Sequence, residues 1–176
     1  MQIANKLAVL ILCGGKGTRL GAKFKDTNKS LIKIDNKTLI SRNINYLFKQ
    51  KFRNIFVVTG HAYKKVEKEV NKKFQKKVFL NFTGLNSSIA LRIKKTLKLL
   101  DKFQYVLIMN GDSLYKFNLQ KIFYETFKKN IDCSFVCTSK IIKYGFLKVN
   151  HKKSIKSFTK NEKISNFFNK DDHLFY

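Results

Sequence analysis

The chain has 176 residues, 44% of them hydrophobic, which is enough to bury a core and argues against disorder. Lys and Arg number 37 against 11 Asp and Glu, and the formal net charge is +26. That charge favours anionic partners, but the lysines are scattered, and a composition without Pro or Trp is typical of A/T-rich coding. We therefore expect attraction of small anionic substrates and no dedicated nucleic-acid function.

Membrane and secretory signals are not expected. No apolar run reaches the roughly 18 residues of a membrane span, and the start of the chain is typical of a strand, not of a signal peptide. Cys13, Cys133 and Cys137 lie in apolar, strand-like runs without metal-ligand spacing, and their odd number argues against a disulfide framework. The expected location is the reducing cytoplasm.

Apolar runs typical of strands alternate with amphipathic segments typical of helices. Leu7–Cys13 is apolar throughout, as expected of a central parallel strand. A basic loop (14–28), a short extended segment (30–34) and a turn at Asp35 and Asn36 follow. The remaining predictions are helices at 38–51, 62–74, 87–100 and 119–129, strands at 54–59, 78–82, 105–109 and 133–138, and a hairpin of 146–149 with 154–158.

This alternation predicts βαβ units and a mainly parallel sheet in one domain, residues 1–176, without linkers or repeats. In the helix predicted at 87–100, an apolar face is expected, made of Ile89, Ile93, Leu97 and Leu100. Ligands of such sheets bind beyond the carboxyl ends of the strands. Three of these ends carry polar or glycine residues, at 14–19, 60–61 and 110–112.

The loop after the first strand has the parts of a phosphate-binding site. Residues 14–19 read Gly-Gly-Lys-Gly-Thr-Arg. Glycines let backbone N–H groups approach a ligand, and the guanidinium of Arg19 suits phosphate oxygens. Neither the dinucleotide-binding pattern G-x-G-x-x-G nor the P-loop pattern G-x-x-x-x-G-K-[ST] is present. The alternative is an ordinary turn with an exposed arginine.

A carboxylate follows a second apolar strand. Asp112 comes after Asn110, Gly111 and the run at 106–109. Mg²⁺ takes one or two carboxylates together with substrate phosphates and water, so Asp112 is a candidate ligand. The alternative is that Asp112 only caps the next turn.

The segment from Leu12 to Leu20 matches the pattern L-x-G-G-x-G-T-R-L, and with Asp112 it resembles the sugar-phosphate and phosphocholine-type nucleotidyltransferases. The resemblance extends from residue 7 to about 163. It implies an α/β fold, a Rossmann-like three-layer sandwich with a mainly parallel, mixed sheet. It also implies that a phosphate-monoester oxygen attacks the α-phosphorus of a nucleoside triphosphate and releases pyrophosphate.

Three further segments carry the resemblance. Lys29 matches the lysine of the family's Pro-Lys-Pro, with Asn28 and Ser30 replacing the prolines. Residues 86–91 match a segment over the base and sugar, and 144–163 match one that lines the sugar-phosphate pocket. Alternatives stay open: a solvated lysine at 29, helix capping by Asn86, Ser87 and Ser88, a core role for Tyr144, and Lys160 in place of Lys163.

The resemblance implies a set of site residues. Mg²⁺ would be held by Asp112, and Arg19 and Lys29 would stabilise the pyrophosphate leaving group. The acceptor, a phosphorylated sugar or small phosphoester, would contact Tyr144, Gly145 and Lys163. The residues expected to bind the nucleotide are Leu12, Gly14, Gly15, Gly17, Thr18, Asn86, Ser87 and Gly111.

The chain departs from the family at its C-terminal end. Members usually run past about 200 residues, with a later Asn-x-Gly-x-Tyr segment and often a second metal-binding aspartate, so we expect a truncated or divergent member. The leading hypothesis is an enzyme that activates a hexose or heptose 1-phosphate for surface polysaccharide. Phosphocholine-type or molybdopterin-type transfer, a non-catalytic nucleotide-binding module and a polyanion-binding protein are the alternatives. The base, the acceptor and the oligomeric state stay open.

Overall fold

The computed structural model describes residues 3–17, 27–137, 145–150 and 154–160. The chain divides into two compact units, residues 1–125 and 126–176. The expectation of a single domain over 1–176 therefore stays a prediction. Within the described residues, every helix is too short or too polar to span a bilayer.

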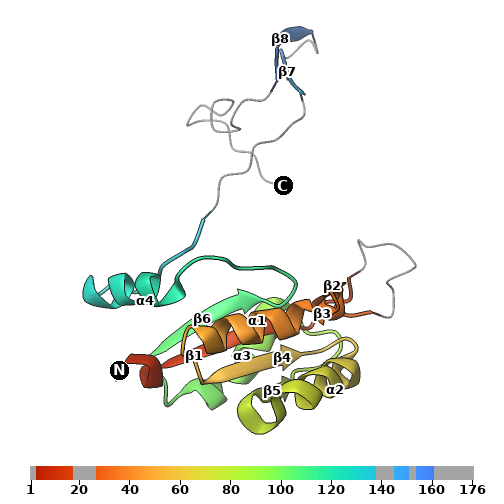
Figure 1. Ribbon diagram of the computed structural model, residues 1–176. Coiled ribbons are helices and arrows are strands. Elements are labelled where there is room, and N and C mark those ends of the chain that lie inside the picture. Colours follow the sequence, from red (N-terminus) through yellow and green to blue (C-terminus); the bar gives the residue numbers. More distant parts are fainter. Residues whose placement is uncertain (1–2, 18–26, 138–144, 151–153, 161–176) are drawn as a thin grey trace. The chain divides into compact units, whose positions relative to one another are not determined.

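A four-stranded parallel sheet forms the centre of the first unit (Figure 1). Strand β1 (Leu7–Cys13) has the predicted bounds and pairs with β4 (Ile55–Thr59) and with β6 (Tyr105–Asn110). Because β1 has neighbours on both edges and helices over both faces, all but one of its residues are buried, which explains its unbroken apolar run. The sheet order is β5 (Phe79–Phe82), β4, β1 and β6.

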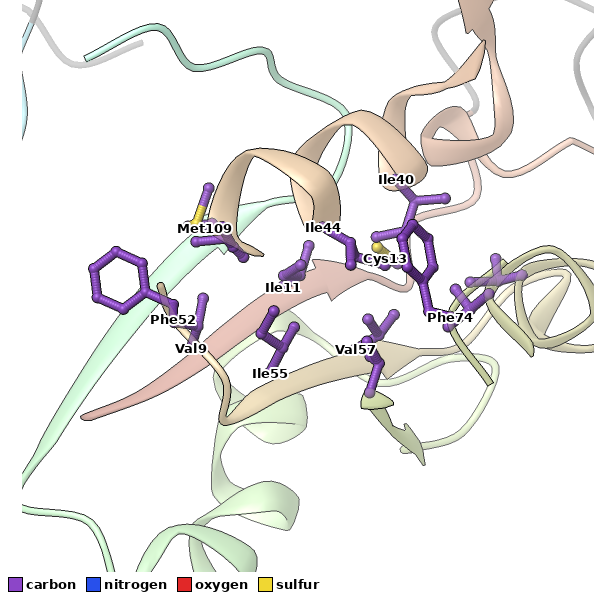
Figure 2. Packing of buried hydrophobic residues seen from close by; sticks show 14 of the residues in the cluster. Val9, Ile11, Cys13, Ile40, Ile44, Phe52, Ile55, Val57, Phe74 and Met109 are labelled. Carbon is purple, nitrogen blue, oxygen red and sulfur yellow. The ribbon is translucent and has the colours of Figure 1, made fainter. Parts of the chain in front are cut away.

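Helices cover both faces of this sheet. Helices α1 (Leu39–Lys49) and α2 (Tyr63–Phe74) pack on one face, and α3 (Ile89–Leu100) packs on the other. On the first face, Ile44 of α1 lies over Ile11 of β1 (Figure 2). The three-layer α/β sandwich is thus confirmed, and every described strand of the central sheet is parallel.

The other described elements are short. Strands β2 (Lys33–Ile34) and β3 (Lys37–Thr38) form a hairpin, with positive φ at Asp35 and Asn36 as its turn demands. In the second unit β7 (Gly145–Val149) and β8 (Ile155–Lys160) pair antiparallel, which confirms the predicted hairpin. The remaining helices are α4 (Leu119–Lys128) and 3-10 turns at Ile3–Lys6, Lys29–Leu31 and Gln75–Lys77.

The extended segment predicted at 30–34 is only partly confirmed, and the strand predicted at 133–138 is wrong. Lys33–Ile34 forms β2, but residues 29–31 form a 3-10 turn, because the Asn28 side chain accepts a hydrogen bond from Ser30 N and caps it. Residues 133–137 form no regular element, and Phe135 is 83% exposed. An apolar run becomes a strand only where another strand pairs with it, and none of the described pairings includes these residues. Cys133 and Cys137 are consequently exposed, whereas Cys13 is buried.

The predicted apolar face of α3 is only partly confirmed. Leu100 is buried and Ile93 packs against the core, but Ile89 and Leu97 are 63% and 49% exposed. The buried residues are Arg92, Thr96 and Leu100. They share the i, i+4, i+8 spacing of one helix face, but two of them are polar, so a search for apolar periodicity does not find this face.

Helices α1 and α2 are joined by a carboxylate network. The Glu69 carboxylate of α2 accepts hydrogen bonds from Thr38 Oγ1 (2.7 Å), from Ser41 Oγ (2.9 Å) and from Lys73 Nζ (2.7 Å). Thr38 is the N-cap of α1. Burial by itself would raise the pKa of Glu69, but the hydrogen bonds from Lys73, Thr38 and Ser41 outweigh it and hold the pKa below its usual value.

We predict that Glu69→Gln lowers the free energy of unfolding by about 1–2 kcal/mol at neutral pH. Since the pKa is depressed in the folded state, the carboxylate contributes stability above its unfolded value and loses it as the pH falls through the folded value. Denaturant unfolding at pH 7 and about pH 3 measures the difference. Glu67→Gln, an exposed change on the same helix, is the control. A deficit independent of pH would contradict the assignment.

Candidate active site

A cavity of about 610 Å³ opens beyond the carboxyl ends of β1 and β6, within the first unit. This volume is typical of a small-molecule site. Eight of the residues expected from the sequence line it: Leu12, Gly14, Gly15, Gly17, Lys29, Asn86, Ser87 and Asp112. Segments from four separate parts of the chain thus meet at the position predicted for a ligand of a parallel sheet.

Gly15 and Gly17 of the loop differ in their conformation and in the space around them. Gly17 has φ +67°, in the left-handed region, and a Cβ there would lie 3.4 Å from Cγ of Lys29. The Lys29 side chain therefore runs beside Gly17. At Gly15, which is exposed, a Cβ would meet nothing within 4 Å. The packing of the protein thus does not demand glycine at 15, and its absent side chain leaves room for close approach of a ligand.

A buried arginine lies beneath the loop. Arg92 is 4% exposed, and its Nη1 donates hydrogen bonds to Thr59 O (3.0 Å) and Thr83 Oγ1 (2.8 Å). Nη1 also donates to Gly84 O (3.0 Å), and Nη2 donates to Gly14 O (3.0 Å). Burial lowers the pKa of Arg92 below its usual value, although a guanidinium stays charged at neutral pH. A single cation therefore joins the ends of β1, β4 and β5.

A buried amide fixes the residues around Lys29. Asn28 is 2% exposed, and its Nδ2 donates to Cys13 O (2.6 Å) and to His61 O (2.9 Å). Its Oδ1 accepts from Ser30 N (3.0 Å) and from Ser30 Oγ (2.8 Å). This network holds the backbone of Lys29 from both of its neighbours, Asn28 and Ser30.

Asp112 is placed by the residue before it. Gly111 N donates to Leu12 O (3.0 Å), and Asn43 Nδ2 of α1 donates to Gly111 O (3.3 Å). A Cβ on Gly111 would lie 2.3 Å from Cys13 Sγ, so only glycine fits against β1. Gly111 does not line the cavity, but it presents Asp112, which is exposed and does.

Cys13 lines the same cavity as a buried thiol. Burial raises its pKa to about 12, and the negative charge of Asp112 adds to this, against the lowering effect of a hydrogen bond with Ser30. The thiol is therefore protonated at neutral pH and does not act as a nucleophile.

The segment before α3 has two roles. Ser88 is the N-cap of α3 and accepts a hydrogen bond from Leu91 N (3.2 Å), and Ser87 Oγ donates to Thr83 O (2.6 Å). Asn86 and Ser87 also line the cavity. Capping thus accounts for Ser88, while ligand contact by Asn86 and Ser87 stays a prediction.

The remaining predicted residues lie in the second unit or outside the described residues. Gly145 begins β7 in the second unit. Thr18, Arg19, Tyr144 and Lys163 lie outside the described residues. Within the described residues, no group of three or more His, Cys, Asp or Glu side chains could hold a metal ion.

Sequence reasoning missed Arg92 and the role of Asn28. One available signal was the rarity of arginine: among 37 basic residues, only Arg19, Arg42, Arg53 and Arg92 are arginines. An arginine four residues after a helix N-cap, on the face that carries Thr96, indicates a buried polar contact more than a solvated cation.

Comparison with known proteins defines the family. Residues 8–170 match the family model described as Nucleotidyl transferase, and the chain belongs to that family. It is similar to D-glycero-alpha-D-manno-heptose 1-phosphate guanylyltransferase of Campylobacter jejuni, with 31% identity over 125 residues, 66% of this chain and 52% of the relative. The enzyme of the same description from Aneurinibacillus thermoaerophilus is 25% identical over 147 residues, 79% of this chain and 61% of the relative. The chain thus spans between half and two thirds of these relatives.

Solved structures share the fold. HddC from Yersinia pseudotuberculosis, complexed with GMP-PN, matches with a TM-score of 0.61 and 22% identity over 89% of this chain and 70% of that one. A putative glucose-1-phosphate thymidylyltransferase from Bacillus anthracis, in complex with a sucrose, matches with a TM-score of 0.61 and 16% identity over 89% and 65%. The predicted Rossmann-like fold is confirmed.

We predict that Asn28→Ala lowers the free energy of unfolding by about 2–3 kcal/mol, because it leaves buried backbone groups without partners. Chemical denaturation measures the change. Asn118→Ala, which removes an exposed bond from Lys121 N to Asn118 Oδ1, is the control and costs about 1 kcal/mol or less. Equal losses in the free energy of unfolding would show that the buried hydrogen bonds of Asn28 stabilise the fold no more than the exposed bond of Asn118.

Proposed function

We propose that the chain transfers a nucleoside monophosphate from a nucleoside triphosphate to a sugar 1-phosphate and releases pyrophosphate. The observation that carries the proposal is the single cavity that gathers the glycine loop, Lys29 and Asp112. The two heptose 1-phosphate guanylyltransferases among the relatives favour a guanine nucleotide as donor and a heptose 1-phosphate as acceptor. The product would be an activated sugar for surface polysaccharide synthesis, made in the cytoplasm.

The residues around the cavity suit a triphosphate. Backbone N–H groups of residues 14–17 would cradle its phosphates, and Lys29 would place an ammonium group beside them. Arg19, from the same loop, would add a second cation to the leaving pyrophosphate. Asn86 and Ser87 would contact the nucleoside, and Tyr144, Gly145 and Lys163 the acceptor.

The donor set fits Mg²⁺. Asp112 is an exposed carboxylate at the cavity, and Mg²⁺ commonly takes one or two carboxylates while phosphates and water complete its shell. Mg²⁺ therefore does not require a cluster of three His, Cys, Asp or Glu side chains, and the described residues contain none. When bound, Mg²⁺ would neutralise phosphate charge in the reaction.

The reaction needs positioning and charge more than a protein nucleophile. An oxygen of the acceptor phosphate forms a bond to the α-phosphorus, and the bond from that phosphorus to the pyrophosphate oxygen breaks. Lys29 and the loop N–H groups would hold the triphosphate in line for this attack. The protonated Cys13 thiol is consistent with direct transfer, without a covalent enzyme intermediate.

We predict that the chain binds GTP more tightly than ATP, CTP, UTP or dTTP, and only with Mg²⁺. Asp112→Asn and Lys29→Ala should each weaken binding by about tenfold or more, because the first removes the proposed Mg²⁺ ligand and the second removes a cation that faces the phosphates. Isothermal titration calorimetry gives the affinities. Asp101→Asn, an exposed carboxylate at the end of α3 outside the cavity, should leave binding unchanged.

Two results would reject the proposal. One is the absence of nucleotide binding at any Mg²⁺ concentration. The other is equal binding of all triphosphates that falls steeply with salt and ignores Asp112, which would indicate attraction by the net charge of +26 alone.

A further inference from the structure

A group of oxygen acceptors lies around Arg92 at the ends of three parallel strands. Thr59 O ends β4, Gly14 O and Gly84 O lie just beyond β1 and β5, and Thr83 Oγ1 is the fourth acceptor. Of these four residues, Gly14 lines the cavity. Carbonyl oxygens carry partial negative charge, so without donors they would repel an anionic ligand above them and would be costly to bury. All four accept hydrogen bonds from Arg92, which itself lines the cavity.

We propose that Arg92 is a positioning residue for the nucleoside triphosphate, acting through the backbone of the glycine loop; this inference rests on the proposed function. It fixes the direction of the first loop peptide, and its positive charge offsets the partial negative charge of the oxygen atoms that it binds at this end of the sheet. Arg92 therefore sets the affinity for the triphosphate without having to contact the reacting atoms.

The direction of the peptide follows from its geometry. Gly14 O accepts from Arg92 Nη2 (3.0 Å) and from His61 N (3.2 Å), so it is held on the protein side. In a planar trans peptide the next N–H points opposite to the carbonyl. The N–H of Gly15 is thereby turned away from the guanidinium, and Gly15 is exposed where Gly14 is buried. A donor oriented in advance toward the ligand is what a phosphate cradle requires.

Two glycines make room for the guanidinium. A Cβ on Gly14 would lie 2.3 Å from Cζ of Arg92, and one on Gly60 would lie 2.1 Å from Nη1. Gly60 lies outside the left-handed region of φ, so its conformation does not demand glycine. The reason for glycine at 60 is therefore the arginine. Glycine at both strand ends, Gly14 and Gly60, thus leaves the space that the Arg92 guanidinium occupies.

Arginine suits this place better than lysine. The acceptors are served from two nitrogens of one planar group, Nη1 for three of them and Nη2 for Gly14 O. An ammonium group keeps the charge but has a single nitrogen on a flexible stem, so it cannot reproduce both directions. Loss of the Arg92 bond leaves Gly14 O with the longer hydrogen bond from His61 N (3.2 Å), so the loop is held less firmly even when the charge is retained.

The first test compares Arg92→Lys with Arg53→Lys. Arg53 also donates to two backbone carbonyls, Phe48 O (3.0 Å) and Phe52 O (3.1 Å), but just before the opposite end of β4. We expect Arg92→Lys to raise the Kd for Mg²⁺-GTP about tenfold with unchanged stoichiometry, and Arg53→Lys to change it less than about twofold. Calorimetry reports Kd and stoichiometry separately, and loss of folded protein lowers only the stoichiometry.

The second test is a double-mutant cycle. Gly60→Ala should raise the Kd because its methyl group displaces the guanidinium, and it should have no further effect in an Arg92→Ala background, where the space is free. Additive effects would overturn the proposal, as would an Arg92→Lys variant with wild-type Kd or with reduced stoichiometry alone. A wild-type chain that binds no nucleotide would instead overturn the proposed function and this inference together.

Discussion

Backbone carbonyl groups at the carboxyl ends of β1, β4 and β5 lie inside the protein, where each requires a hydrogen-bond donor. Two buried side chains supply many of these donors. Arg92 reaches from α3 to Gly14, Thr59 and Gly84, and Asn28 reaches from the loop to Cys13 and His61. The sheet can end beside an open cavity because these two side chains donate hydrogen bonds to the carbonyl oxygens at the strand ends. The positions of the other site residues depend on this arrangement.

These hydrogen bonds place charged side chains of both signs, Lys29 and Asp112, around the same cavity. Asn28 holds the 3-10 turn that carries Lys29, and Gly17 lets the Lys29 side chain lie along the loop. Asn43 and β1 hold Gly111, and the next residue, Asp112, lines the same cavity. Cations and a carboxylate that line one cavity together with a glycine loop are suited to a triphosphate with its metal ion. The fold therefore supplies positioning and electrostatics, which are the main requirements of phosphoryl transfer.

The sequence predicted those parts that depend on local pattern. The bounds of β1 agree because its residues are apolar without interruption, and the cavity lies where parallel strand ends predict it. Arg92 was missed because its partner Gly14 is 78 residues away, and no periodicity encodes that contact. The strand predicted at 133–138 failed because apolar content alone does not supply a pairing neighbour. Local propensity thus identified most of the elements, while long-range polar contacts determined the site.

A crystal structure of the chain with Mg²⁺ and a non-hydrolysable GTP analogue tests the central claim most directly. The account predicts that the triphosphate lies over residues 14–17 against Lys29, with the ion about 2.1 Å from an oxygen of Asp112. Arg92 should keep its bonds to Gly14 O and Thr59 O in the complex. A nucleotide bound elsewhere on the basic surface, or an ion held away from Asp112, would contradict the account.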